Sequence, residues 1–321
     1  MSALKDAFFR YNSRPNSEPF SLSHYFMASL DRAIENADIA FNADQQITHI
    51  VNRLKEYKSE HNIEEVILGV SGGIDSAVVA ALFKEADWNV IGVTLPIDQN
   101  PDETERGIEV CTSLGIEHVS TDLTDVYFDT AMAMLSLDPD IMVADAPAAK
   151  IPAKIRLGNI KARLRMITLY NLASMHNGLV ASTDNFSELA AGFWTLHGDV
   201  GDVAPIQSLT KSWEVPVIAE ALSLPESVVY ATPTDGLGID TGDEAQFGYT
   251  YAQADLFVLD LINNTASPFD MNKDDQRVVS AIKERLKNSA FKRANPSNIG
   301  HPITGHKRYN RLEYLDKTLT L

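Results

Sequence analysis

The chain has little cysteine, an excess of negative over positive charge, and no long apolar stretch. Its only cysteine, Cys111, excludes an internal disulfide and any metal or redox site of the Cys-x-x-Cys type. We expect this residue to be a small buried side chain on a helix. The 27 Lys and Arg against 44 Asp and Glu give a net charge of −17, which argues against a nucleic-acid partner because such proteins present a basic face.

The sequence also shows neither a signal peptide nor a membrane-spanning segment. No window approaches the roughly 18 uncharged apolar residues that a membrane span needs, and Asp6 and Arg10 interrupt the N-terminus before a signal peptide could form. We therefore expect a cytoplasmic protein with no membrane partner.

Short apolar runs that alternate with amphipathic stretches indicate an α/β fold, with a doubly wound parallel sheet flanked by helices. The predicted strands are 65–71, 89–95, 116–120 and 179–183. The predicted helices are 23–35, 44–61, 77–86, 103–114 (capped by Gly115), 159–177, 187–195, 211–222, 252–263 and 274–288. We interpret residues 1–43 as an N-terminal arm, 44–290 as one domain, 138–157 as an irregular connection within it, and 291–321 as a polar tail.

One segment carries the strongest chemical signal, Gly69-Val-Ser-Gly-Gly-Ile-Asp-Ser76, between a predicted strand and a predicted helix. Consecutive glycines allow backbone conformations closed to other residues, so that backbone N–H groups at a helix N-terminus can surround phosphate oxygens. The serines add hydroxyl donors and Asp75 can hold Mg²⁺. The segment is neither a Walker motif nor GxGxxG. A tight turn alone would explain the glycines but not the serines and the aspartate.

This segment resembles the pyrophosphate loop of the N-type ATP pyrophosphatases, and the rest of the chain resembles one family among them, the NAD synthetases. The resemblance spans roughly 46–295. It implies an adenine nucleotide alpha hydrolase-like fold for that domain. It is carried by the segments 158–166 (Gly-Asn-Ile-Lys-Ala-Arg-Leu-Arg-Met), 178–195, 198–206, 208–211, 233–234 and 241–249.

The resemblance also implies a role for individual residues. The phosphate loop consists of Gly69, Val70, Ser71, Gly72, Gly73, Ile74, Asp75 and Ser76. The further ATP contacts are Thr183, Lys211 and Thr234, and the Mg²⁺ ligands are Asp75 and Glu188. Asp75 and Lys211 are the catalytic pair. The residues implied to bind deamido-NAD are Arg163, Asp202 and Lys292, the last from the C-terminal tail.

Simpler roles compete with these assignments. Lys211 and Lys292 could be solvated surface charges, Arg163 could pair with any acidic neighbour, and Glu188 could only cap a helix. Asp202, together with Asp199, could merely shape a turn.

The chain also departs from the family pattern at the acceptor end. Leu196 replaces a frequent lysine that would face the dinucleotide, and Phe291 replaces a frequent histidine. The loop 199–202 is one residue shorter than the common form. The implied ATP chemistry is therefore complete, whereas recognition of the acceptor is altered.

The implied reaction converts a carboxylate to an amide through an acyl adenylate, with release of AMP and pyrophosphate. No stretch of the chain is left over for a glutaminase domain, so free ammonia is the expected nitrogen source, with a separate glutaminase subunit as the alternative. Family members are homodimers, with the helix 159–177 near the interface. Two other functions stay open: a related ligase that acts on another carboxylate, and an ATP-binding regulatory protein without turnover. A tRNA-modifying role is disfavoured by the charge.

Overall fold

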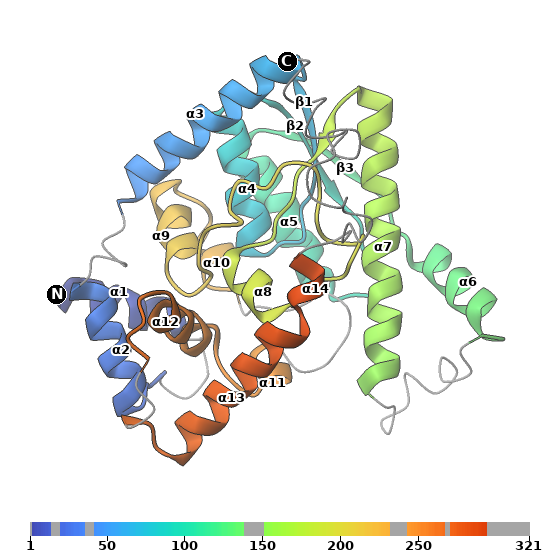
Figure 1. The fold of residues 1–321 in the computed structure, drawn as a ribbon. Coiled ribbons are helices and arrows are strands. Elements are labelled where there is room, and N and C mark those ends of the chain that lie inside the picture. Colours follow the sequence, from blue (N-terminus) through green and yellow to red (C-terminus); the bar gives the residue numbers. More distant parts are fainter. Residues whose placement is uncertain are drawn as a thin grey trace, which may run out of the picture.

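The computed structural model describes residues 2–13, 20–35, 42–137, 151–231, 243–266 and 270–293. Its centre is a parallel sheet in the order β3-β2-β1-β4 (Figure 1). The strands are β1 (Glu65–Gly69), β2 (Asn89–Thr94), β3 (Glu117–Ser120) and β4 (Leu179–Val180). The predicted parallel α/β fold is confirmed. From β1 the chain adds strands on one side and then returns to the other side with β4. The loops after β1 and β4 therefore diverge, and ligands bind at such a point in open α/β sheets.

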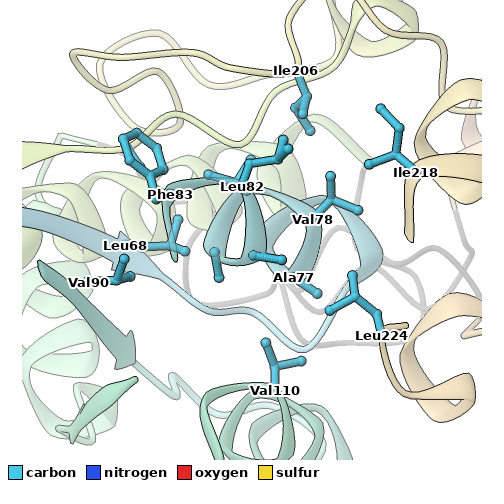
Figure 2. Packing of buried hydrophobic residues seen from close by; sticks show 14 of the residues in the cluster. Leu68, Ala77, Val78, Leu82, Phe83, Val90, Val110, Ile206, Ile218 and Leu224 are labelled. Carbon is cyan, nitrogen blue, oxygen red and sulfur yellow. The ribbon is translucent and has the colours of Figure 1, made fainter. Parts of the chain in front are cut away.

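Helices cover both faces of this sheet. One face packs against α3 (Ala43–His61), α4 (Ile74–Glu85), α5 (Pro101–Leu114), α9 (Glu214–Ala221) and α10 (Glu226–Val229). The other packs against α6 (Thr124–Met134) and α7 (Ile151–His176). Side chains of β1 alternate accordingly, since Leu68 belongs to the first cluster and Ile67 to the second. Figure 2 shows α4, with Val78 and Leu82, packed among the strands, α5 and α9.

A second, helical core lies beside the sheet domain. It is formed by α1 (Ser2–Asn12), α2 (His24–Glu35), α8 (Phe186–Ala191), α11 (Asp243–Phe247), α12 (Tyr251–Ile262) and α13 (Lys273–Asn288), which is followed by α14 (Ala290–Arg293). Figure 1 shows α1 and α2 next to α12. Phe8 and Phe26 are fully buried there, and Arg32 forms a 2.8 Å ion pair with buried Asp260. The division into arm, domain and tail stays a prediction.

Several predicted elements have other ends in the structure. The helix predicted for 187–195 ends at Ala191, because Gly192 adopts a left-handed conformation with φ 67°. The connection predicted for 138–157 is helical from Ile151, where Pro152 stands in a first turn that needs no N–H from it; residues 138–150 lie outside the described part. The helix predicted for 211–222 begins only at Glu214.

Two further predictions can be compared with the structure. Cys111 is 1% exposed and lies on α5, as expected for a packing residue, and burial raises the pKa of its thiol to about 11. Within the described ranges, no helix is both long enough and apolar enough to cross a membrane.

Candidate active site

A cavity of about 490 Å³ opens beside the carboxyl ends of β1 and β4. Its walls come from the loop 69–76, from α5 and α7, from the segment after α8, and from α13 and α14. The cavity thus lies where the strand order reverses, the position expected for a ligand site in this fold. Of the residues that the sequence predicts for the site, those lining this cavity are Gly69 to Ser76, Thr183, Glu188, Lys211 and Lys292.

The loop 69–76 turns the chain from β1 into α4. Gly72 has φ +82°, and a Cβ placed there would lie 2.1 Å from the backbone oxygen of Glu103. The hydroxyl of Ser76 donates to the Gly73 carbonyl at 3.0 Å and lies 3.2 Å from the Ser71 hydroxyl, which fixes the turn from within. No side chain caps the N-terminus of α4. Its first amides are therefore available to an anion in the cavity.

Lys211 connects the two carboxylates that the sequence predicts as metal ligands. Its Nζ lies 2.7 Å from Oε1 of Glu188 and 3.1 Å from Oδ2 of Asp75, and 5.0 Å from the centre of the Tyr251 ring. Burial alone would lower the pKa of Lys211, but the two carboxylates outweigh it and raise that pKa well above its ordinary value. Lys211 is therefore a charged ammonium facing the loop, and not a solvated surface charge.

Glu188 caps a helix and also contacts Lys211. Its backbone N–H and its Oε2 form a capping box with Asn185 at the start of α8, while its Oε1 accepts from Lys211. Asn185 in turn donates to Oδ1 of Asp75 at 2.9 Å. Burial raises the pKa of Glu188, and Lys211 opposes that shift. The cap thus fixes the carboxylate that meets the lysine.

The three residues predicted to bind the acceptor are not brought together. Lys292 reaches the cavity, where its Nζ donates to the carbonyls of Gly192 at 2.9 Å and Trp194 at 2.6 Å. Arg163 is exposed outside the cavity lining and donates to the Leu196 carbonyl at 3.2 Å. Thr234, predicted to contact ATP, lies outside the described residues.

Asp202 binds protein groups rather than lining the cavity. Its Oδ2 accepts from the backbone N–H of Val180 in β4, and its Oδ1 accepts from the Tyr170 hydroxyl of α7, both at 2.9 Å. The loop 198–202 is thereby attached to the strand that leads to Thr183. This arrangement favours the turn-shaping role for Asp202.

Replacing Asp202 with alanine should destabilise the protein. The amide of Val180 is fully buried and would lose its acceptor, which costs about 1–2 kcal/mol of unfolding free energy. Urea denaturation measures this loss, and Asp202→Asn should lose less because it keeps one acceptor oxygen. If Asp202→Ala left stability unchanged and only weakened acceptor binding, the predicted binding role would be favoured instead.

Six charged residues of the cavity have no role predicted from the sequence: Glu103, Arg106, Arg165, Asp184, Asp243 and Arg285. Arg106 donates to the Gly72 carbonyl at 3.3 Å, and Arg285 donates to the Ala191 carbonyl at 3.1 Å. Burial raises the pKa of Asp199 to about 6. Arg165 could have been noticed from its place two residues after Arg163. Nothing in the local sequence marks Arg106 or Arg285.

The residues present fit a magnesium ion shared with a phosphate ligand. Across the ranges that the structure describes, there is no group of three or more His, Cys, Asp or Glu side chains able to hold a metal. Mg²⁺ commonly uses one or two carboxylates and completes its shell with water and substrate phosphates. Asp75 and Glu188, which approach the same ammonium group, match that donor set.

The chain is similar to known proteins in sequence and in fold. The NAD synthase family model matches residues 46–296. An NH(3)-dependent NAD(+) synthetase from Carboxydothermus hydrogenoformans is 36% identical over 68% of this chain and 86% of its own length. Two solved structures, each 26% identical, are similar in fold. An NMN synthetase from Francisella tularensis has a TM-score of 0.67 over 79% of this chain and 96% of its own. An NH3-dependent NAD synthetase from Campylobacter jejuni has a TM-score of 0.60 over 81% and 100%.

Proposed function

Because the chain belongs to the NAD synthase family, we propose that it amidates the nicotinate carboxylate of deamido-NAD with ammonia and ATP, forming NAD, AMP and pyrophosphate. The observation that carries this proposal is the convergence of Asp75, Glu188 and Lys211 on the glycine loop in one cavity. Departure of pyrophosphate requires groups that bind its growing negative charge, and the loop amides, the ammonium and two carboxylates able to hold Mg²⁺ are such groups. Family membership assigns the reaction, and this cluster supports the proposal that the chain retains it.

In the first step, a carboxylate oxygen of the acceptor attacks the α phosphorus of ATP. The bond from that phosphorus to the bridging oxygen breaks, and pyrophosphate leaves with both bonding electrons. Negative charge then grows on the leaving group, where the amides of the loop 69–76 and the ammonium of Lys211 can stabilise it. Asp75 and Glu188 would hold Mg²⁺, which neutralises further phosphate charge when bound.

In the second step, ammonia attacks the acyl carbon and AMP leaves with the electrons of the broken carbon–oxygen bond. A base must take a proton from the nitrogen, and we assign this role to Asp199. The residue lines the cavity, and burial raises the pKa of its carboxyl group to about 6. A base with a pKa near the working pH combines availability with proton affinity.

The pH dependence of the second step tests Asp199. Since its pKa is raised to about 6, its carboxyl group is ionised at neutral pH and becomes protonated, and inactive as a base, below that value. At a fixed concentration of free ammonia, kcat/KM should fall as the pH drops through about 6, and Asp199→Asn should lack this limb. If kcat/KM of Asp199→Asn still falls as the pH drops through about 6, a group other than Asp199 is the base.

A second candidate acceptor is the mononucleotide, nicotinic acid mononucleotide, which would give NMN. Two observations favour testing it. Leu196 removes the cation that the family pattern places against the dinucleotide, and a similar structure is that of an NMN synthetase.

Product formation should be measured with each acceptor at equal concentration, with ATP, Mg²⁺ and ammonium present and pyrophosphate and AMP followed in parallel. Faster turnover with deamido-NAD supports the main proposal, and faster turnover with the mononucleotide supports the second candidate. ATP binding without product from either, or from other carboxylates, would favour a regulatory protein. Glutamine in place of ammonium should support no turnover unless a separate glutaminase subunit is added.

We also propose that the protein is a cytoplasmic homodimer that uses α6 and α7 as its interface. These helices expose apolar side chains that a monomer would place in water, among them Met132, Ile167 and Met175, each more than half exposed. Such a patch commonly marks an interface. Light scattering should give twice the chain mass, and Ile167→Glu should reduce it to one chain.

A further inference from the structure

Ser212, the residue after Lys211, is held through all of its polar groups from outside the cavity. Its N–H and its hydroxyl donate to Oδ2 of Asp255 in α12, at 3.3 and 2.6 Å. Its carbonyl accepts from Nδ2 of Asn12, the last residue of α1, at 2.9 Å. These bonds satisfy the Ser212 backbone outside a helix, in which its carbonyl would face Pro216, a residue without an N–H, and α9 begins only at Glu214. They also fix the position of the backbone from which the Lys211 side chain extends.

Asn12 is well placed to hold the segment rigidly. It is 8% exposed, and Nδ2 also donates to the Phe8 carbonyl one turn back at 2.8 Å. Phe8 in turn packs on Trp213, with ring centres 5.8 Å apart. The end of α1 therefore lies directly against the segment 211–213 that carries Lys211.

The same end of α1 is linked to a second wall of the cavity through Glu220 and Tyr230. Tyr11 donates to Oε2 of Glu220, and Arg10 donates to the same oxygen at 2.9 Å. Oε1 of Glu220 accepts from the Tyr230 hydroxyl at 2.7 Å. Tyr230 precedes Ala231, which lines the cavity. The end of α1 thus contacts the segment that carries Lys211 directly and is joined to the segment before Ala231 through Glu220.

From these contacts we infer that α1 is a positioning element of the phosphate site and that Asn12 acts through Ser212 to place Lys211. Asn12 lies outside residues 46–296, the part matched by the family model, so the match to the family does not account for it. The inference rests on the proposed function only in giving Lys211 the phosphates of ATP as its ligand. Misplacing a charged group by a fraction of its contact distance weakens every interaction that depends on it.

A double-mutant cycle on ATP affinity tests this role in the full-length protein with Mg²⁺ and no acceptor. Asn12→Ala and Lys211→Met should each weaken ATP binding, the first by about tenfold as expected for a lost buried hydrogen bond. The double variant should bind no more weakly than Lys211→Met, because Asn12 acts through that lysine. Asn12→Leu, which keeps a similar volume and lacks the donor without adding a charge, should behave as Asn12→Ala does and replaces it if Asn12→Ala fails to fold.

The control is Arg32→Ala, which removes the ion pair of α2 with Asp260 and touches neither Ser212 nor Lys211. At a temperature where circular dichroism shows every variant folded, it should keep ATP affinity within about twofold of the wild type. Additive effects of Asn12→Ala and Lys211→Met, unchanged ATP affinity in Asn12→Ala, or an equal loss in Arg32→Ala would each overturn the inference. Wild-type protein that binds ATP but makes no NAD would refute the proposed function and leave this test intact.

Discussion

Lys211→Met is expected to slow pyrophosphate release by about 10²–10³-fold, because it removes the ammonium that contacts both Asp75 and Glu188 in the cavity. Besides the weaker ATP binding expected of this variant, kcat itself should fall at saturating ATP, since the charge that Lys211 stabilises grows further as pyrophosphate leaves. Single-turnover formation of AMP and pyrophosphate measures the step without product release. Methionine keeps most of the side-chain volume, so the packing on Tyr251 is retained.

Lys84→Met is the matched control for this experiment. Lys84 is exposed on α4, and its replacement should leave turnover unchanged. If Lys211→Met kept more than about a tenth of the wild-type rate, the mechanism would be wrong in placing the leaving group at Lys211.

Gly72→Ala should abolish measurable ATP binding. Alanine at φ +82° is strained, and its Cβ would lie 2.1 Å from the Glu103 oxygen, so either the loop or α5 must move. A phosphate cradle made of backbone amides tolerates no such displacement. Calorimetric titration with ATP and Mg²⁺ measures the effect, and we expect an affinity at least about 100-fold weaker.

Gly115→Ala separates strain from function. Gly115 also has a positive φ, +63°, but its Cβ position has no atom within 4 Å apart from those of the adjoining chain. This variant should lose about 1 kcal/mol of stability and keep its ATP affinity. If Gly72→Ala bound ATP as tightly as Gly115→Ala does, the loop 69–76 would not be the phosphate site.

The parts of the site that the sequence predicts well are contiguous. The loop 69–76 carries its glycines, serines and aspartate within eight residues, and its place between a strand and a helix follows from local apolar patterning. The same holds for the alternation of strands and helices along the chain, which predicts a parallel sheet. Local patterns read in this way need no knowledge of distant contacts.

The parts that the sequence does not predict depend on distant contacts. The helical character of 211–222 predicts a helix that begins at Lys211, although Pro216 offers no N–H to the Ser212 carbonyl. The groups that bind the Ser212 backbone instead, Asn12 in α1 and Asp255 in α12, are distant in the sequence. Arg106 and Arg285 reach the cavity only through the packing of α5 and α13. Asp202 was implied as a substrate ligand by its motif, and its bond to Val180 exists only once β4 is paired. Such long-range partners leave no periodic trace in the sequence.

The central claim is that an acyl adenylate forms at this site. Its most direct test traces the oxygen atoms of the acceptor carboxylate into the products. Deamido-NAD labelled with ¹⁸O in its nicotinate carboxylate should be converted with ATP, Mg²⁺ and ammonium, and the products weighed by mass spectrometry. Attack of the carboxylate on the α phosphorus predicts one ¹⁸O in each AMP, the other retained in the amide of NAD, and none in pyrophosphate. AMP without the label, or label in the pyrophosphate, would contradict an acyl adenylate at this site.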